Sequence, residues 1–282
     1  MDNNNLTYVS KLAIGLTSSF LWFCLAVGAN AETTLEKIQR TGTLKVAIRE
    51  DAAPFGYIDD NNNLQGYCLD FVALLEKQLT EKLSRNTIII RLLKSKIDNR
   101  FALVAKDLVY LECGPNTIRD DVASTVQFST DFFITGTQFL VKKNNPKNID
   151  LDSNLENIKI GVLTNTTTAE SIANKYPLAQ IIRFRGANGR NRGIQELQQG
   201  KIDAMVSEGI LLRATAQKQG LSQQEYPLIP DTPLTCDRYG MILTAPDEEW
   251  KNFVDSVINS PEAKRIFNSW FGELTIDTDG GC

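Results

Sequence analysis

Two successive series of alternating strand and helix patterns constrain the fold of this chain more than any other feature. In the first series, residues 43–48, 87–93 and 107–112 have strand patterns, and residues 70–83 and 99–106 have helical patterns between them. Such alternation predicts a mainly parallel sheet with crossover helices. The continuous apolar run at 87–93 favours a strand covered on both faces.

The alternation restarts after a polar break at residues 144–154. Strands are expected at 158–163, 180–184 and 203–207, helices at 167–176, 192–200 and 208–219, and then a strand at 239–243 and helices at 247–259 and 261–271. The expected fold class is therefore α/β, with two sheets in a two-lobed clamp. Because ligands of open α/β sheets bind at the carboxyl ends of strands, two facing sheets would define one cleft.

The first 31 residues have the pattern of a secretory signal peptide. The apolar run LAIGLTSSFLWFCLAVG follows Lys11 and precedes Ala29-Asn30-Ala31, a small-x-small cleavage site. The alternative is an uncleaved membrane anchor, but the run is short for a membrane span. We expect cleavage after Ala31 and a periplasmic mature protein.

Four cysteines remain after this cleavage: Cys68, Cys113, Cys236 and Cys282. An even number in an exported protein indicates disulfides, with three possible pairings. The pairing 68–113 with 236–282 would keep each bridge within one part of the chain. A zinc site is not expected, because no two of these cysteines are close in sequence.

The sequence contains no histidine, which excludes Ser-His-Asp and Cys-His catalysis. It also has no phosphate-binding loop and no dinucleotide fingerprint. The formal net charge of −4 argues against a nucleic-acid partner. We therefore expect no catalytic residues, no cofactor and no metal.

Polar residues follow several expected strands and could bind a zwitterion. Arg119 offers a fork for a carboxylate, and a threonine run at 164–168 supplies hydroxyls where a helix starts. Glu208 follows a strand that should be buried and could pair with an ammonium group. The alternatives are that the threonines only cap a helix and that Glu208 is an ordinary carboxylate at a helix start.

From about Thr34 to Gly272, an ordered set of phrases resembles the periplasmic substrate-binding proteins of polar amino-acid ABC transporters. They are LEKIQRTGTLKVAI, PFGYIDDNNNLQGYCLDF, NTIRDDV, VQFSTDFFITGTQFLVKK, LQQGKIDAMVSEGILL, YGMIL and WFG. The resemblance implies a monomer that closes on a free amino acid and presents it to a membrane permease. It implies a signal peptide at 1–31, one lobe formed by 32–139 and 238–275, a second lobe at 140–237, and a tail at 276–282.

The resemblance also implies roles for individual residues. Thr117, Arg119, Thr167 and Thr168 would bind the ligand carboxylate, and Glu208, where the family usually has aspartate, would hold the α-amino group. Two departures stand out: Arg119 follows Thr117 by two residues rather than the usual five, and Thr166 replaces a usual glycine. The segments Gly136–Phe139 and around Tyr239 would form the hinge.

The phrases IREDAAPFGY, NRFAL and LECG are most similar to glutamate- and aspartate-binding members. This similarity implies ligand contacts by Arg49 and Arg100, with Arg190 as a further candidate. If Glu50 and Glu112 instead neutralise these arginines, a neutral polar ligand such as glutamine or asparagine is expected. An alternative from another class is a dehydratase of the prephenate or arogenate type, which needs a proton donor such as Glu50, Glu112 or Glu208. A sensory module ranks last.

Overall fold

A computed structural model describes residues 31–122, 124–145, 147 and 149–272 of the chain. The expected signal sequence, apart from Ala31, and the tail at 276–282 lie outside these residues, so cleavage after Ala31 stays a prediction. In the described part, no helix is both long enough and apolar enough to span a membrane.

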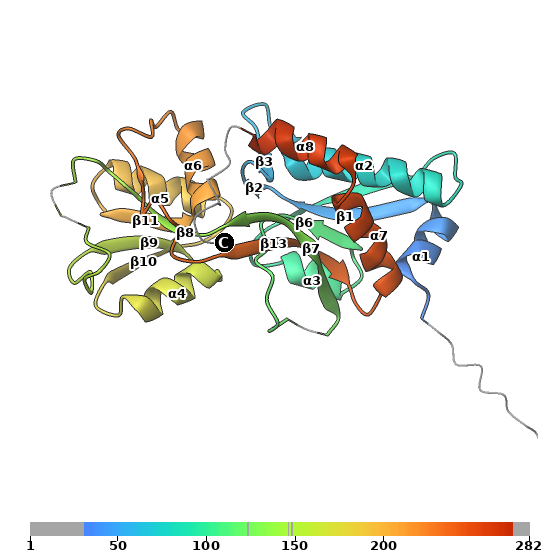
Figure 1. The fold of residues 1–282 in the computed structure, drawn as a ribbon, viewed down its shortest axis with the longest axis horizontal. Coiled ribbons are helices and arrows are strands. Elements are labelled where there is room, and N and C mark those ends of the chain that lie inside the picture. Colours follow the sequence, from blue (N-terminus) through green and yellow to red (C-terminus); the bar gives the residue numbers. More distant parts are fainter. Residues whose placement is uncertain (1–30, 123, 146, 148, 273–282) are drawn as a thin grey trace, which may run out of the picture. The chain divides into compact units, whose positions relative to one another are not determined.

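The first lobe is a five-stranded sheet with helices packed on it, accompanied by a small three-stranded sheet (Figure 1). Its strands are β1 (Thr43–Arg49), β2 (Asp51–Ala52), β3 (Gly56–Ile58), β4 (Leu64–Gln65), β5 (Ile89–Ser95), β6 (Leu111–Cys113), β7 (Val126–Thr135) and β13 (Asp237–Thr244). Its helices are α1 (Thr34–Thr41), α2 (Tyr67–Lys82), α3 (Arg100–Ala105), α7 (Glu248–Ile258) and α8 (Pro261–Phe271). The strand order is β5-β1-β6-β13-β7, in which β1 is parallel to β5 and β6.

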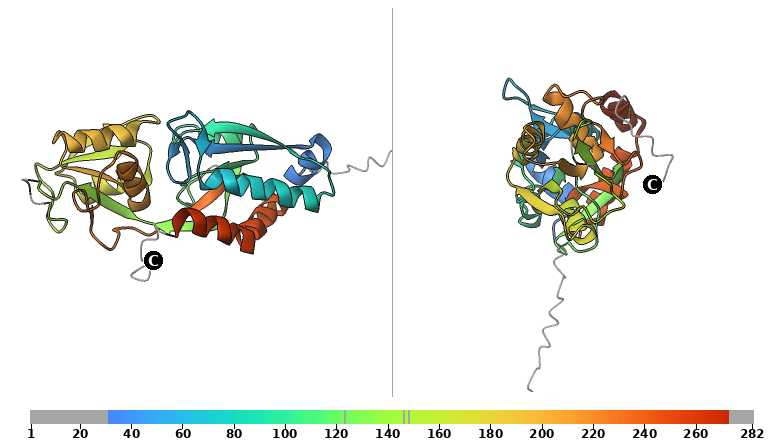
Figure 2. Two further views of the ribbon diagram at one scale, coloured as in Figure 1. Left: turned by 90° about the horizontal axis from the view of Figure 1, so that it is seen from above. Right: turned by 90° about the vertical axis from the view of Figure 1, so that its left-hand side faces the viewer.

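The second lobe is a similar five-stranded sheet with its own helices (Figures 1 and 2). Its strands are β8 (Thr137–Val141), β9 (Lys159–Leu163), β10 (Gln180–Phe184), β11 (Ala204–Glu208) and β12 (Leu228–Ile229), and its helices are α4 (Thr167–Lys175), α5 (Gly189–Gln198) and α6 (Gly209–Lys218). The order is β10-β9-β11-β8-β12, with β9 parallel to β10 and β11. The expected two-lobed α/β fold, with mainly parallel central strands, is confirmed.

Local sequence signals explain several element ends. Thr33 caps α1 and forms a capping box with Glu36, and Gly42 ends that helix in the left-handed conformation at φ 64°. Ser260 caps α8, whose first residue is Pro261. The cap and the proline are local features of the sequence, and the helix expected at 261–271 has the bounds that they predict.

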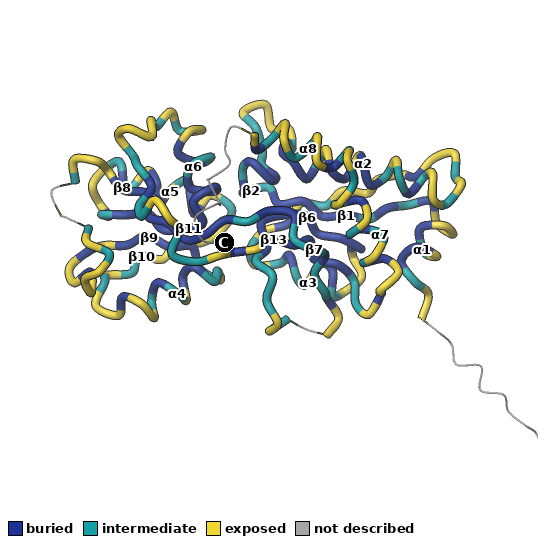
Figure 3. Tube along the Cα trace, in the orientation of Figure 1, coloured by how far each residue is buried: buried dark blue, intermediate teal, exposed yellow. Residues whose placement is uncertain are grey.

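The core of each lobe lies between its sheet and its helices, and the central strands are buried along most of their length (Figure 3). In the first lobe, the rings of Phe55, Phe133 and Phe271 pack with centroids 4.7–5.1 Å apart. Tyr239 of β13 joins them, 5.5 Å from Phe55. This aromatic packing fixes the start of β13 next to the crossover between the lobes.

The chain crosses between the two sheets at Gly136, the single residue between β7 and β8. A Cβ at Gly136 would lie 1.8 Å from the carbonyl oxygen of Thr235, so only glycine allows this approach. The returning segment is tied to the same place, because the backbone N–H of Thr137 donates to Oγ1 of Thr235 at 2.9 Å. The exact lobe boundaries suggested by the sequence remain a proposal.

The strand expected at 87–93 occurs as β5, but it is not covered on both faces. It is the edge strand, paired only with β1, and Ile89 and Leu92 are 65% and 39% exposed. A continuous apolar run does not distinguish a central strand from an edge strand, so the covered-strand prediction was wrong. The strand expected at 107–112 is also shorter, because β6 begins only at Leu111.

One disulfide joins Cys68, near the start of α2, to Cys113, the last residue of β6, with the Cα atoms 5.7 Å apart. This confirms one of the expected pairs. Cys236 is also disulfide-bonded. The proposed pairing of Cys236 with Cys282 stays a prediction, because Cys282 lies outside the described residues.

We expect the double substitution Cys68→Ala/Cys113→Ala to lower the free energy of unfolding by about 4 kcal/mol. The bridge closes a loop with a sequence separation of 45 residues, and cross-linking such a loop removes chain entropy from the unfolded state. Urea denaturation of both proteins under non-reducing conditions measures the difference. A loss below about 1 kcal/mol would contradict this stabilising role.

Candidate functional site

The first lobe contributes charged residues from the carboxyl ends of its strands and from α3. Arg49 is the last residue of β1 and is 2% exposed. Its side chain passes over Gly114, where a Cβ would lie 2.3 Å from Cγ of Arg49. Arg100 begins α3, and Thr117 and Arg119 lie on the tip that follows β6. Gly114 is therefore required for the placement of Arg49.

The second lobe contributes residues from helix starts and from the end of β11. Thr166 caps α4, accepting from the N–H of Ala169 at 3.1 Å, so the expected threonine cap is present. Thr167 is in the first turn of the same helix, and Arg190 is in the first turn of α5. Glu208 ends β11 and is 6% exposed.

These residues from both lobes line one cavity, which we call the cleft. Its lining is formed by Arg49, Ile97, Arg100, Pro115, Thr117, Arg119, Thr166, Thr167, Arg190, Glu208 and Leu211. Seven of the eight residues expected to bind ligand are among them. The eighth, Thr168, is buried in the first turn of α4, and its Oγ1 has no hydrogen-bond partner among the described residues.

The cleft is narrow in this conformation, with a volume of about 20 Å³. That is room for about one water molecule. An amino acid could enter only if the lobes or the lining side chains moved apart. The arrangement is that of a closed clamp.

Arg49 is already paired with a carboxylate that the sequence interpretation did not consider. Its Nε and Nη2 lie 2.8 and 2.6 Å from Oδ1 of Asp51, whose side chain is 5% exposed. Glu50 instead faces Lys94 and Lys96 at 4.0 and 3.5 Å. The sequence contains a signal for this pair. Arg49 and Asp51 are two residues apart, and side chains two apart in an extended chain point to the same side.

Glu112 lies behind the arginines and is fully buried. It accepts hydrogen bonds from Oγ of Ser95 at 2.5 Å and from Nδ2 of Asn116 at 2.7 Å. Burial raises the pKa of Glu112, against the opposing effect of the nearby charges on Arg49 and Arg100. It forms no ion pair within 4.0 Å with either arginine in the described part of the chain, so it does not neutralise them by direct contact.

Three arginines of the cleft, Arg100, Arg119 and Arg190, have a buried Nε atom without a hydrogen-bond partner in the described part of the chain. Arg100 and Arg190 are the more enclosed of the three. Within the residues that the structure describes, Arg100 donates only to the carbonyl oxygen of Ile97 at 3.3 Å, and Arg190 only to that of Asp51 at 3.2 Å. Among the described residues, neither has a carboxylate within ion-pair distance. Burial, helped by the charge of Arg49, lowers the pKa of Arg100 to about 10.

Arg119 is less enclosed than the other arginines. Its Nε lies 3.1 Å from Oδ1 of Asp121, but this contact lacks hydrogen-bond geometry, and the Asp121 side chain is 77% exposed. An ion pair with such an exposed partner contributes little stability. Arg119 is therefore available to another anion.

Glu208 is not used as a helix cap. It precedes α6, yet its side chain makes no cap hydrogen bond and instead accepts from Oγ of Ser207 at 2.6 Å. Two further polar groups lie near it on β13. The hydroxyl of Tyr239 is buried and has no hydrogen-bond partner in the part of the chain that the structure describes, and its pKa is raised by burial and by the charge of Glu208.

Asp237 is the second of these groups, and sequence reasoning did not single it out. Its Oδ2 accepts from Oγ1 of Thr235 at 2.6 Å, next to the crossover. Burial raises the pKa of Asp237 to about 6, and the charge of Glu208 acts in the same direction. No sequence pattern distinguishes this aspartate from one in a surface turn, because its neighbours come from distant strands.

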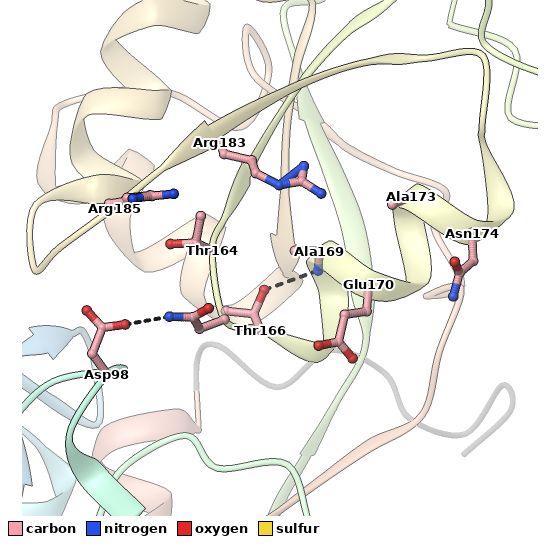
Figure 4. A pocket seen from close by; sticks show the side chains of 10 residues that line it. Asp98, Thr164, Thr166, Ala169, Glu170, Ala173, Asn174, Arg183 and Arg185 are labelled. Atoms are coloured by element: carbon pink, nitrogen blue, oxygen red, sulfur yellow. Dashed lines mark hydrogen bonds between the residues drawn. The ribbon is translucent and has the colours of Figure 1, made fainter.

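Direct contacts between the lobes flank the cleft. Nδ2 of Asn165 donates to Oδ1 of Asp98 at 2.8 Å, and Nζ of Lys218 donates to the carbonyl oxygen of Ile58 at 2.7 Å. Figure 4 shows Asp98 together with Arg183 and Arg185 among the residues that line a second pocket. The volume of this pocket is about 810 Å³. These contacts connect the two lobes in the closed arrangement.

Replacing Asp237 by asparagine should remove a pH-dependent penalty on folding. A carboxyl group whose pKa is raised in the folded state binds more protons there than in the unfolded chain, so its contribution to stability falls as pH rises from about 4 to about 6. Asp237→Asn should therefore match the wild type near pH 4 and exceed it by up to about 3 kcal/mol above pH 7. Urea denaturation across pH 4–8 measures the difference, and a difference independent of pH would contradict the assignment.

Comparison with known proteins identifies similar sequences. The chain is 29% identical over 250 residues to a glutamate/aspartate import solute-binding protein of Escherichia coli, covering 86% of this chain and 80% of the relative. It is 27% identical over 246 residues to an L-glutamate/L-aspartate-binding protein of Pseudomonas aeruginosa, covering 84% and 80%. It is also 25% identical over 232 residues to a glutamine-binding protein of Geobacillus stearothermophilus, covering 80% and 81%.

Solved structures share the fold. An ancestral amino acid-binding protein, described as a precursor of cyclohexadienyl dehydratase, superposes with a TM-score of 0.71 at 23% identity, covering 85% of this chain and 99% of that one. The model of the bacterial extracellular solute-binding proteins, family 3, matches residues 44–273. The chain therefore belongs to family 3 of the bacterial extracellular solute-binding proteins.

Proposed function

We propose that this protein captures a free acidic amino acid, glutamate or aspartate, by closure of its two lobes. It acts as a monomer in the periplasm and delivers the ligand to the permease of an ABC transporter. The names of the glutamate- and aspartate-binding relatives support the ligand class. The observation that carries the proposal is the pair of buried arginines, Arg100 and Arg190, whose donors lack an anionic partner.

The backbone of the ligand is held from both lobes. Arg119 and Thr117 bind the α-carboxylate from the first lobe, and Thr167 and Thr168 complete its site at the start of α4. A helix start suits this group because its free N–H groups and positive dipole end attract an anion. Glu208 binds the α-ammonium group. Contacts from both sides make closure dependent on the ligand.

The side-chain carboxylate of the ligand lies between Arg100 and Arg190. Burying an arginine without a counter-charge is unfavourable by several kcal/mol, so a carboxylate is a better partner than an amide. An amide side chain supplies one carbonyl acceptor and no charge. The two arginines come from different lobes, so this contact also strengthens closure.

The net charge of the cleft favours the same ligand. Four lining residues are arginines, and Glu208 is the one carboxylate among the lining residues. Asp51 offsets Arg49, and Glu112 lies further back with a raised pKa. The net charge of the four arginines, Glu208, Asp51 and Glu112 together is +1 if Glu112 is charged and +2 if it is neutral. A ligand of net charge −1 reduces this excess, whereas glutamine does not.

Two other functions were expected as alternatives. A neutral polar ligand would require the arginines to be neutralised internally, which the contacts support only for Arg49. A dehydratase reaction would require a placed proton donor. The likeness to the dehydratase precursor is at 23% identity and therefore supports the fold alone.

Glu208→Gln should weaken binding of glutamate by ~10² or more. The ligand ammonium would lose its charged partner in a desolvated site. Thermal unfolding without ligand should change little, because Glu208 makes no cap hydrogen bond. Titration calorimetry measures the affinity, with Glu225→Gln as a control at an exposed carboxylate. An unchanged affinity would remove Glu208 from the ammonium site.

Glutamate or aspartate should bind at least ~10²-fold more tightly than the corresponding amide, a difference of about 3 kcal/mol. Calorimetry with glutamate, aspartate, glutamine and asparagine tests this. Arg100→Met should weaken glutamate far more than glutamine, because only the acid loses an ion pair. Arg265→Met, at an arginine whose side chain is 70% exposed, is the matched control. Tighter binding of either amide than of both acids would refute the proposed ligand class.

A further inference from the structure

Asp51 is a buried acid that touches functional residues of both lobes. Its carboxylate Oδ1 accepts from Nε of Arg49 at 2.8 Å and lies 2.6 Å from Nη2 of the same side chain as an ion pair. Its backbone carbonyl oxygen accepts from Nη1 of Arg190 at 3.2 Å. Arg49 and Arg190 both line the cleft. Asp51 therefore lies where the charges of the two lobes meet.

The carboxylate of Asp51 occupies the Nε side of the Arg49 guanidinium group. One hydrogen bond from Nε and a short ion-pair contact from Nη2 reach the same oxygen, Oδ1. A hydrogen bond between two charged groups is stronger than one between neutral groups. Because both side chains are at most 5% exposed, solvent screens this pair little. Arg49 and Asp51 thus form an internal ion pair in the wall of the cleft.

We propose that Asp51 is a specificity-determining residue of the cleft. Its negative charge lowers the attraction that the cleft exerts on the side-chain carboxylate of a ligand, and so it limits the discrimination between an acidic amino acid and its amide. The inference rests on the proposed function, because it concerns the same ligand side chain. In this proposal Arg100 and Arg190 bind the ligand carboxylate, and Arg49 is the partner of Asp51.

The neighbouring carboxylate provides a matched comparison. Glu50 carries the same charge one residue earlier, but it faces Lys94 and Lys96, whose side chains are 49% and 52% exposed. Charges in that position are screened by water and salt. Loss of charge at Glu50 should therefore have little influence on the ligand, whereas loss of charge at Asp51 should have a large influence.

The test is titration calorimetry of the mature protein with glutamate and with glutamine, for the wild type, Asp51→Asn and Glu50→Gln. The asparagine carbonyl can still accept from Arg49, so the substitution removes charge and keeps the acceptor. At an effective dielectric constant near 20, one unit charge roughly 12 Å from the ligand carboxylate changes an affinity by on the order of tenfold. Asp51→Asn should tighten glutamate about tenfold.

The measured quantity is the ratio of the glutamine Kd to the glutamate Kd. The two ligands share a backbone, so effects on the α-carboxylate and α-ammonium sites cancel in this ratio. It should rise about tenfold in Asp51→Asn and stay within about threefold of the wild type in Glu50→Gln. A ratio that is unchanged or lower in Asp51→Asn would overturn the inference, and so would an equal rise in Glu50→Gln.

A second comparison applies if Asp51→Asn does not fold, as judged by circular dichroism. Arg49→Gln should lower the ratio, and adding Asp51→Asn to it should restore the ratio because the charges are then removed as a pair. Failure of the second substitution to restore the ratio would overturn the inference. Preference of the wild type for glutamine would refute the proposed function alone, because the shift in the ratio still tests Asp51. Binding of neither ligand by the wild type would refute both.

Discussion

The burial of arginines without enough carboxylates is the constraint on which the cleft depends. Arg49 and Arg190 are almost completely enclosed, yet among the residues placed by the structure only Arg49 has an acid in direct contact. A guanidinium group keeps its charge even when burial lowers its pKa, so it cannot escape the penalty by losing a proton. A ligand carboxylate offers the missing counter-charge, and the same contact joins the lobes. Binding of the ligand would thus compensate the charge of the arginines and close the lobes at the same time.

The crossover between the lobes has its own constraints. Gly136 and Thr235 approach so closely that a side chain at residue 136 is excluded, and Thr235 also donates to Asp237. Hinge segments are short stretches that absorb the change in backbone angles during closure. Here the crossover lies next to Glu208 in space, because the N–H of Gly209 donates to the carbonyl oxygen of Gly136 at 2.9 Å. A ligand ammonium on Glu208 would therefore act close to the crossover itself.

Much of this arrangement could be predicted from the sequence. Alternating patterns specify the strands and helices, and the carboxyl ends of parallel strands lie together at one edge of their sheet. Thr117, Arg119 and Glu208 line one cleft for this reason, whereas Arg100 was implied only by the resemblance. Other features depend on contacts that no local pattern encodes. The exposure of β5 follows from its edge position, and the environment of Asp237 comes from strands distant in sequence. The partner of Arg49 is Asp51, two residues after it, and not Glu50 or Glu112, which the sequence suggested.

The most direct measurement of the central claim is a crystal structure of the mature protein with bound glutamate. The account predicts that the side-chain carboxylate lies within about 3 Å of guanidinium nitrogens of both Arg100 and Arg190, and that the α-ammonium group contacts Glu208. The ion pair between Arg49 and Asp51 should persist in that complex. A glutamate side chain more than about 4 Å from both Arg100 and Arg190 would contradict the claim that these arginines bind it.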